Sequence, residues 1–219
     1  MHPALLLLAD SRLPAGGHAH SGGAEAAIAS GHVTGLPSLA AFLRGRLHTT
    51  GRVSAALAAT ACTLAQRSGP SAPWRDLQAE ADARTTSPAL RRASCRQGKL
   101  LLHVARRLWP GLDALAAAVP EPHHPLALGA AAHAAGAAPG DAALAAAYHS
   151  VTGPATAAVR LLGLDPVEVH RLLAGLTGDL ARIAGQAHGS PESLPACSAP
   201  ALDLLAEQHA RADLRLFVS

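Results

Sequence analysis

The side chains with the clearest chemical potential in this sequence are its thirteen histidines. Two pairs stand close together, His18 with His20 and His123 with His124, and each pair could supply two imidazoles to a metal ion. A defined transition-metal site needs three or four converging ligands, so neither pair makes a site alone. We favour the interpretation that the histidines are polar surface or hydrogen-bonded core residues, and keep these four as weak metal candidates.

Motifs that mark common catalytic and nucleotide sites are missing from the sequence. It contains no GxxxxGK[ST] phosphate loop, no GxGxxG segment opening a helix, no GxSxG elbow and no HExxH pair. Nucleotide hydrolases and metalloproteases of the usual kinds are therefore excluded. We expect a protein that is not an enzyme and that binds no cofactor directly.

A glycine-rich turn lies near the start of the chain, where Pro14 is followed by Gly16 and Gly17. Ser21 is placed to cap a helix in which Glu25 sits one turn later. A glycine pair before a helix suits either a phosphate cradle or a close protein contact. Since no Lys follows the last glycine and no strand precedes it, the sequence favours the protein contact.

Basic residues are concentrated between positions 84 and 107, with no Asp or Glu from 83 to 112. Seven of the 18 Lys and Arg residues lie there, namely Arg84, Arg91, Arg92, Arg96, Lys99, Arg106 and Arg107. Three interpretations stay open: a solvated or docking surface, a surface for an acidic protein, and a nucleic-acid site. The last lacks interleaved aromatic residues and a helix-turn-helix pattern, so we retain a helical nucleic-acid-binding protein only as the alternative function.

Composition indicates which elements must position these residues. The 219-residue chain is 49% hydrophobic and 15% charged, and only 2% of its residues are aromatic. Alanine is abundant and loses no side-chain entropy in a helix, whereas β-branched residues are few. We predict an all-α fold, a single-domain helical bundle of roughly eight to ten helices that spans residues 1–219.

Hydrophobic periodicity and proline positions predict several individual helices. A long helix is expected over 37–66 despite Gly45 and Gly51, and Asp165 should cap an amphipathic helix that continues to Ala187, with Glu168 reaching back as in a capping box. Further helices are expected over 88–108, 125–136 and 141–162.

The stretch 122–159 carries a single charged residue, Asp141, and could be mistaken for two membrane spans. Alanine gains little in lipid, and the stretch holds histidines and prolines, so two buried helices of a bundle explain it better. The three cysteines are widely spaced, and the apolar run Ala4 to Ala9 has no basic flank. We expect a cytoplasmic protein without disulfides.

Order and spacing of the N-terminal residues closely resemble the signature of the urease accessory protein family UreF. The matching features are Leu5 to Asp10, Ser11, Leu13-Pro14, Gly16-Gly17, His20-Ser21, Gly22 and Glu25. Further matches follow in the same order, and the last residues, Arg215 to Ser219, resemble the family's ending. His18 stands where the family usually has an aromatic residue.

The resemblance implies an all-α homodimer that hydrolyses nothing itself. It implies a scaffold that bridges a UreD-like (UreH-like) accessory protein and the GTPase UreG in the complex inserting nickel into apo-urease. Nickel would then be handled by the complex and GTP bound by the partner. Residues 200–219 are expected to form a partner-docking segment, and nucleic acid and membrane are not expected as partners.

The resemblance also implies which residues contact partners. We expect the apolar C-terminus to wait for the UreD-like partner, and the turn near His18 together with Tyr148, the sole tyrosine, to face the GTPase. The expected partner-binding set is Pro14, Gly16, Gly17, His18, His20, Ser21, Glu25, Tyr148, Arg160, Arg215, Leu216, Phe217 and Ser219.

Overall fold

The computed structural model describes residues 2–10, 12–67, 73–212 and 215–217, with the side chain of His18 excepted. These residues form helices and connecting loops, and no strand occurs among them. The all-α prediction is confirmed. The α-helices are α1 (Ala4–Ala9), α2 (Ala24–Ala29), α3 (Leu36–Arg46), α4 (Arg52–Gln66), α5 (Trp74–Arg84), α6 (Pro88–Leu108), α7 (Asp113–Ala118), α8 (His124–Ala134), α9 (Pro139–Leu162), α10 (Pro166–Gly175), α11 (Thr177–Gly185) and α12 (Pro200–Ala210).

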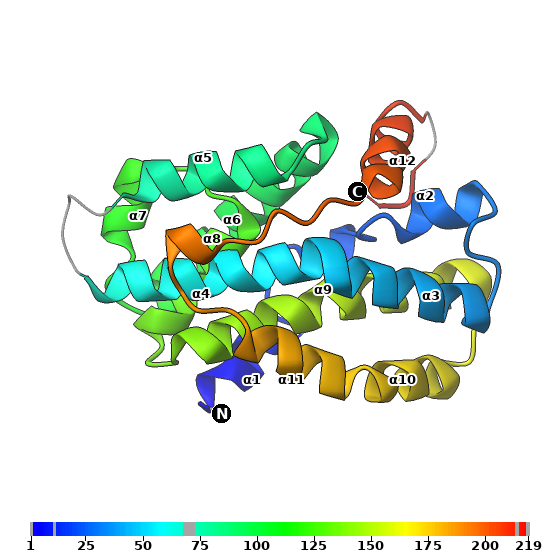
Figure 1. The fold of residues 1–219 in the computed structure, drawn as a ribbon, viewed down its shortest axis with the longest axis horizontal. Coiled ribbons are helices and arrows are strands. Elements are labelled where there is room, and N and C mark those ends of the chain that lie inside the picture. The colour runs from blue at the N-terminus through cyan, green and yellow to red at the C-terminus, as the bar shows by residue number, and fades with distance from the viewer. Residues whose placement is uncertain (1, 11, 68–72, 213–214, 218–219) are drawn as a thin grey trace.

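Helices α3 and α4 form one continuous rod, as the prediction of a helix over 37–66 required. A π-helical turn, η2 (Leu47–Gly51), joins them. Within it the Thr49 hydroxyl donates to the Gly45 carbonyl at 2.8 Å and the Thr50 hydroxyl to the Arg46 carbonyl at 3.3 Å. In Figure 1 this rod crosses the middle of the molecule, with α9 behind it, α10 and α11 along one side, and α5 and α12 along the other.

Small residues let the central helices approach each other closely. Helix α4 packs against both α8 and α9. At the crossing of α4 and α8, a Cβ atom on Gly129 would lie 2.1 Å from the Ala58 carbonyl oxygen and 2.7 Å from the Ala61 Cβ. Gly98 of α6 is equally tight, since a Cβ there would lie 2.0 Å from the Pro122 carbonyl oxygen. The backbones come into contact at these points, which requires small residues such as glycine and alanine there.

The predicted helix from Pro166 to Ala187 is wrong in one respect, because it is broken at Leu176. The Leu176 N–H donates to the Leu173 carbonyl at 3.0 Å, a bond three residues back that tightens the chain. Gly175 and Gly178 flank the break and lower the cost of interrupting the helix. The two pieces then pack separately, α10 against α3 and α9, and α11 against α4 and α9.

Two predicted helix starts are confirmed in part. The Asp165 carboxylate accepts the Val167 N–H at 2.8 Å and so caps α10. Glu168 does not complete the capping box, however, because its carboxylate instead accepts from the Arg171 guanidinium on the exposed face. Helix α6 begins at Pro88 as predicted, with the Ser87 hydroxyl accepting the Leu90 N–H at 3.2 Å.

The uncharged stretch 122–159 folds into α8 and most of α9, and both helices contribute buried residues to the core. None of the helices in the described ranges is both long enough and apolar enough to cross a membrane. The prediction of two buried bundle helices is therefore confirmed. Cys62, Cys95 and Cys197 are free thiols.

A pair of glycine substitutions tests the close packing of α4 on α8. We expect Gly129→Ala to lower the free energy of unfolding by about 3 kcal/mol, because the new methyl group collides with backbone rather than with a movable side chain. Gly45→Ala is the control, since no atom lies within 4 Å of the added Cβ, and it should stabilise by about 0.5–1 kcal/mol. Urea unfolding followed by circular dichroism measures both, and equal midpoints would contradict the packing argument.

Candidate functional site

The glycine turn that precedes α2 is anchored on α6. Gly16 has a φ of +76°, a left-handed conformation that disfavours other residues, and a Cβ on it would lie 2.7 Å from the Leu100 Cδ1. Gly17 begins the short 3-10 helix η1 (Gly17–Ala19) and is exposed, and a Cβ added to it would have Gln97 Nε2, 3.9 Å away, as its nearest neighbour. Gly16 therefore packs closely against Leu100 of α6, and the backbone of Gly17 is accessible to another molecule.

The predicted cap of α2 is confirmed in part, because Ser21 bonds to the first turn although Gly23 is the N-cap residue. Ser21 is fully buried, and its hydroxyl accepts the Glu25 N–H at 3.3 Å at the start of α2. The Glu25 side chain itself has a second role that sequence reasoning did not foresee. The Glu25 carboxylate is directed toward the C-terminal segment of the chain.

Glu25 holds the C-terminal segment through its carboxylate. Oε1 accepts the Leu216 N–H at 2.7 Å and Oε2 accepts the Phe217 N–H at 3.0 Å. His209 of α12 stands beside this carboxylate, with Nε2 3.4 Å from Glu25 Oε2. The Glu25 side chain is only 13% exposed, which strengthens these bonds relative to bonds made in water. We call this arrangement of Glu25, His209, Leu216 and Phe217 the C-terminal clasp.

The C-terminal side chains divide between the fold and the surface. Phe217 is 8% exposed and packs against Ala24 and Ala157, with the Arg160 guanidinium 5.5 Å from its ring centre. The expectation that this apolar end waits free for a partner is thus wrong for Phe217, because its own fold offers an apolar niche. Leu216 is 80% exposed and Arg215 is exposed. Ser219, also expected to contact a partner, lies outside the described residues.

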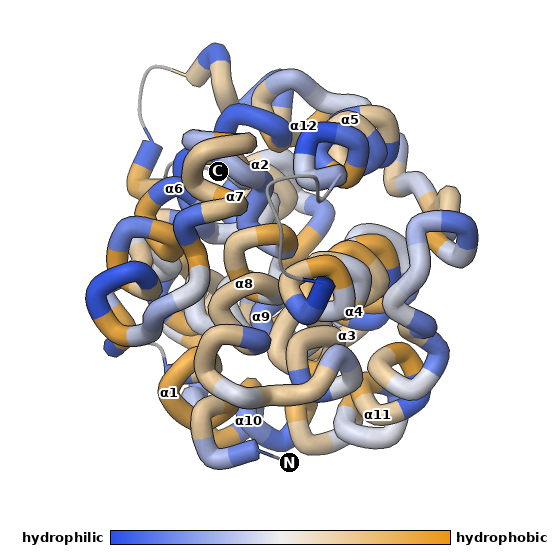
Figure 2. Tube along the Cα trace, turned by 90° about the vertical axis from the view of Figure 1, so that its left-hand side faces the viewer, coloured by the Kyte–Doolittle hydropathy of each residue, from blue (hydrophilic) through white to orange (hydrophobic). Residues whose placement is uncertain are grey.

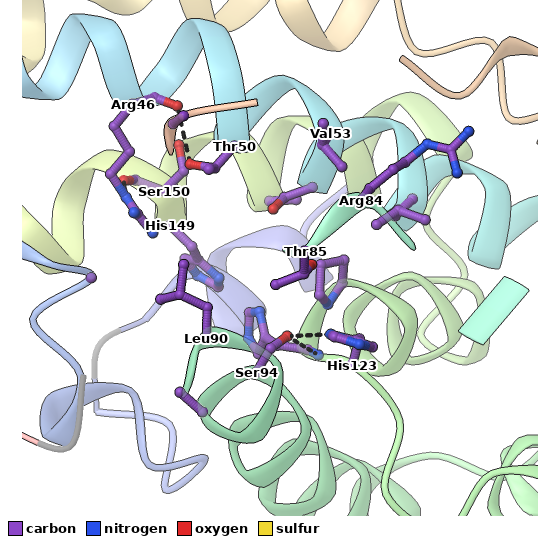
Figure 3. A pocket seen from close by; sticks show the side chains of 18 of the residues that line it. Arg46, Thr50, Val53, Arg84, Thr85, Leu90, Ser94, His123, His149 and Ser150 are labelled. Atoms are coloured by element: carbon purple, nitrogen blue, oxygen red, sulfur yellow. Dashed lines mark hydrogen bonds between the residues drawn. The ribbon is translucent and has the colours of Figure 1, made fainter. Parts of the chain in front are cut away.

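A histidine-lined hollow lies beneath the glycine turn. Two adjoining cavities, of about 190 and about 180 Å³, share His20, His124 and His149 in their linings. Figure 3 shows the first cavity, with His149 and Ser150 reaching in from α9, Ser94 from α6, and Arg46 and Thr50 from the α3–α4 rod. The rings of His124 and His149 are 5.7 Å apart, centre to centre.

Burial keeps the histidines of this hollow neutral. It lowers the pKa of His124 to about 3, with smaller contributions from the electrostatic repulsion that protonated His149 and His20 would exert, and lowers the pKa of His149 to about 4. Burial also lowers the pKa of His20, with a smaller contribution from Arg96. These rings are therefore neutral at neutral pH.

His123 has a structural role, because both of its ring nitrogens have partners within the protein and neither is free to bind a metal ion. It is 2% exposed, and its two ring nitrogens face Ser94 Oγ at 2.9 Å and Asp82 Oδ1 at 3.0 Å. Among the side chains that the structure describes, no group of three or more His, Cys, Asp or Glu residues is placed to hold a metal ion. Of the four weak metal candidates, only His20 and His124 come together, and the His18 side chain lies outside the described part.

Tyr148 lies on the surface of α9. It is 40% exposed, and its ring centre is 6.4 Å from that of His149, which turns inward toward the hollow. The alternative that this tyrosine is a core residue is excluded by that exposure. Its ring is accessible for contact with another molecule.

The basic stretch 84–107 is partly neutralised in three dimensions. Arg84 pairs with Glu80 and donates to the Pro195 carbonyl, Arg91 donates to the Thr85 carbonyl, and two further ion pairs form with carboxylates outside the stretch. Those pairs are Lys99 with Glu121 and Arg106 with Asp113. A continuous cationic face of the kind that tracks a nucleic-acid backbone does not result, which weakens the nucleic-acid alternative.

Sequence patterns did not indicate the contacts that several residues of the site make. His149 lines the hollow although the adjacent Tyr148 is exposed on the surface, and His209 meets Glu25 from the far end of the chain. Arg46 lines the first cavity and donates through Nε to the Ser150 carbonyl at 2.9 Å, and burial lowers its pKa to about 10. Helical periodicity predicts which face of a helix is buried, but it cannot identify a partner from another helix.

Comparison with known proteins places this architecture in a family. The UreF family model matches residues 33–177. A urease accessory protein UreF of Mycobacterium sp. (strain JLS) is 47% identical over 219 residues, covering 98% of this chain and 97% of the relative. The UreF proteins of Mycolicibacterium vanbaalenii and Mycobacterium tuberculosis (strain H37Rv) are each 45% identical over 217 residues, with the same coverage. The chain therefore belongs to the UreF family of urease accessory proteins.

Proposed function

We propose that this protein is a non-enzymatic scaffold that bridges a UreD-like (UreH-like) protein and a UreG-like GTPase in the complex that inserts nickel into apo-urease. The observation that carries the proposal is a convergence in space. Gly17, His20 and Arg160, expected from the family resemblance to contact partners, line a single cavity together with the docked Phe217, although the four come from both ends and the later half of the chain. One composite surface can thus serve several partners.

Other parts of the proposal follow from the chemistry of the chain. A protein without a catalytic motif suits a role in which the GTPase partner binds and hydrolyses the nucleotide. Nickel is the cargo of the complex in this proposal. A cytoplasmic homodimer is the form in which we expect the protein to act.

The exposed parts of the C-terminal segment are proposed as the contact with the UreD-like partner. Leu216 is a large apolar side chain held in water by a backbone that the Glu25 carboxylate fixes in place. A pre-ordered segment loses less conformational entropy on binding than a frayed end would lose. The segment therefore presents Leu216 and Arg215 as ready anchors.

Shortening the chain tests the C-terminal contact. A chain ending at Ala212 should lose co-purification with a co-expressed UreD-like protein, because both Leu216 and the clasp are removed. Leu216→Asp should weaken assembly at least tenfold, while Leu108→Asp, a similarly exposed leucine at the far end of α6, should change it less than twofold. Size-exclusion chromatography of the co-expressed proteins is the readout, and full-strength assembly by the shortened chain would refute this contact.

Substitutions on α9 and in the glycine turn near His18 test the proposed contact with the UreG-like GTPase. Tyr148→Asp, and separately His18→Asp, should abolish recruitment of the UreG-like partner, since each puts a charge into an interface of aromatic and glycine character. Helical circular dichroism should be unchanged because Tyr148 is exposed. Val167→Asp on α10, where the side chain is 72% exposed, serves as the control and should leave recruitment intact. Loss of helicity together with recruitment would indicate a structural role.

The exposed glycine offers a third test. The isolated protein should show no saturable GTP or ATP binding by calorimetry at tens of micromolar, because the turn lacks the Lys of a phosphate loop. Gly17→Val should weaken complex assembly without unfolding the chain, since the space around its Cβ is open. Gly140→Val, where no atom lies within 4 Å, controls for a general effect of the substitution. A measured nucleotide site in the isolated chain would overturn the scaffold proposal.

A further inference from the structure

A groove lined by arginines runs between α6 and α12 and is closed at one end by the C-terminal segment. It has a volume of about 440 Å³, and its lining includes Arg92 and Arg96 of α6, His209 of α12, and Arg215, Leu216 and Phe217. We propose that this groove binds an acidic segment of a partner protein, in which carboxylate side chains alternate with an apolar one. The inference deepens the scaffold function proposed above and rests on it, because it gives the chemistry of the partner that meets the C-terminal segment.

The charge of the groove is not balanced by the described part of the chain. Arg92, Arg96 and Arg215 form no ion pair with a described residue, whereas Lys99 and Arg106 further along α6 do. Unbalanced arginines at the wall of a groove favour an anionic occupant.

Two carboxylates at the walls of the groove have other partners. Glu207 accepts from the Ser87 hydroxyl at 2.5 Å and from the Ala89 N–H at 2.8 Å, and Arg92 contributes to the low pKa of this carboxyl. Glu25 is held by the backbone N–H groups of the C-terminal segment. Both carboxylates therefore stabilise the walls of the groove.

Geometry suits carboxylates in particular. Arg92 and Arg96 are one helical turn apart on α6 and both are exposed, so their guanidinium groups stand on the same face. A guanidinium group can donate two parallel hydrogen bonds to one carboxylate, which a lysine cannot do. Two acidic side chains of a peptide could thus be bound side by side.

Apolar surface at the rim favours a peptide over a nucleic acid. Leu216 is 80% exposed next to the arginines, and Phe217 forms part of the wall. A nucleic-acid backbone gains nothing from an exposed leucine, whereas a protein segment can cover it and exclude water. The positive stretch is also short, since Glu121 and Asp113 neutralise its continuation.

The C-terminal clasp keeps the groove intact without a partner. Glu25 binds the backbone of Leu216 and Phe217, which form the wall of the groove beside α6 and α12. This wall is therefore present before any ligand binds. In Figure 1 and in Figure 2 the largely hydrophobic helix α1 lies well apart from α12, which forms one wall of the groove.

Fluorescence anisotropy with the full chain tests this inference. The probe is a fluorescein-labelled ten-residue peptide of Glu and Asp with two leucines, and the comparison ligands are the same peptide with Lys replacing the acids, a ten-nucleotide single-stranded DNA, and inorganic phosphate. The double variant Arg92→Glu with Arg96→Glu should bind the acidic peptide at least tenfold more weakly. Arg52→Glu with Arg107→Glu, an equal charge change at exposed sites outside the lining of the groove, should shift binding less than threefold.

Several outcomes would overturn the inference. They are absence of saturable binding of the acidic peptide to the unaltered protein, equal losses in both double variants, and binding of the DNA as tight as that of the peptide. Displacement of the peptide by millimolar phosphate would also overturn it, because a simple anion site would then suffice.

Assembly with the UreD-like partner separates this inference from the proposed function. If the Arg92→Glu, Arg96→Glu variant assembles normally with that partner, the groove is not its docking site, and the inference fails while the scaffold function stands. If the chain ending at Ala212 assembles normally, the C-terminal contact of the proposed function is refuted, regardless of how tightly the acidic peptide binds. Loss of both peptide binding and assembly in the arginine variant, with both retained in the control variant, supports the inference.

Discussion

The close contact of α4 with α8 is the constraint on which the rest of the molecule depends. At Gly129 the two backbones are so near that a single methyl group has no room beside the Ala58 carbonyl oxygen. Short distances between helix axes compensate for a core that has few large side chains, because dispersion contacts and buried area are recovered by backbone and alanine methyl groups. Helix α9 packs on the same two helices, so its position is fixed by the same contact.

The hollow under the glycine turn is a consequence of this packing. Helices α8 and α9 place His124 and His149 in the lining of this hollow, where burial keeps both rings neutral. His123, one residue earlier, is instead held by hydrogen bonds with Ser94 and Asp82. Neighbouring residues of one type thus have different roles, because a helix start directs successive side chains to different surroundings.

The C-terminal segment joins the two ends of the chain through one carboxylate. Glu25 satisfies two backbone N–H groups that a frayed terminus would leave to water, and Phe217 fills an apolar niche between α2 and α9. The same clasp leaves Leu216 and Arg215 on the surface. Self-docking and partner docking are therefore compatible, since the side chains that face the fold differ from those that face solvent.

Composition and periodicity alone determined the helical class, the starts of α6 and α10, and the burial of the uncharged stretch 122–159, because these depend on local propensity and on which face of a helix is apolar. The family resemblance depended on ordered motifs at both ends. Only the tertiary structure decided which charges are balanced: within the acid-free stretch 84–107, Glu121 and Asp113 pair with Lys99 and Arg106, whereas Arg92 and Arg96 form no ion pair with a described residue. It likewise decided the break at Leu176 and the bonds from Glu25 to the C-terminal segment. Glu25 and Leu216 lie far apart in the chain, as do Lys99 and Glu121, and no local pattern in a single sequence records the distance between such residues.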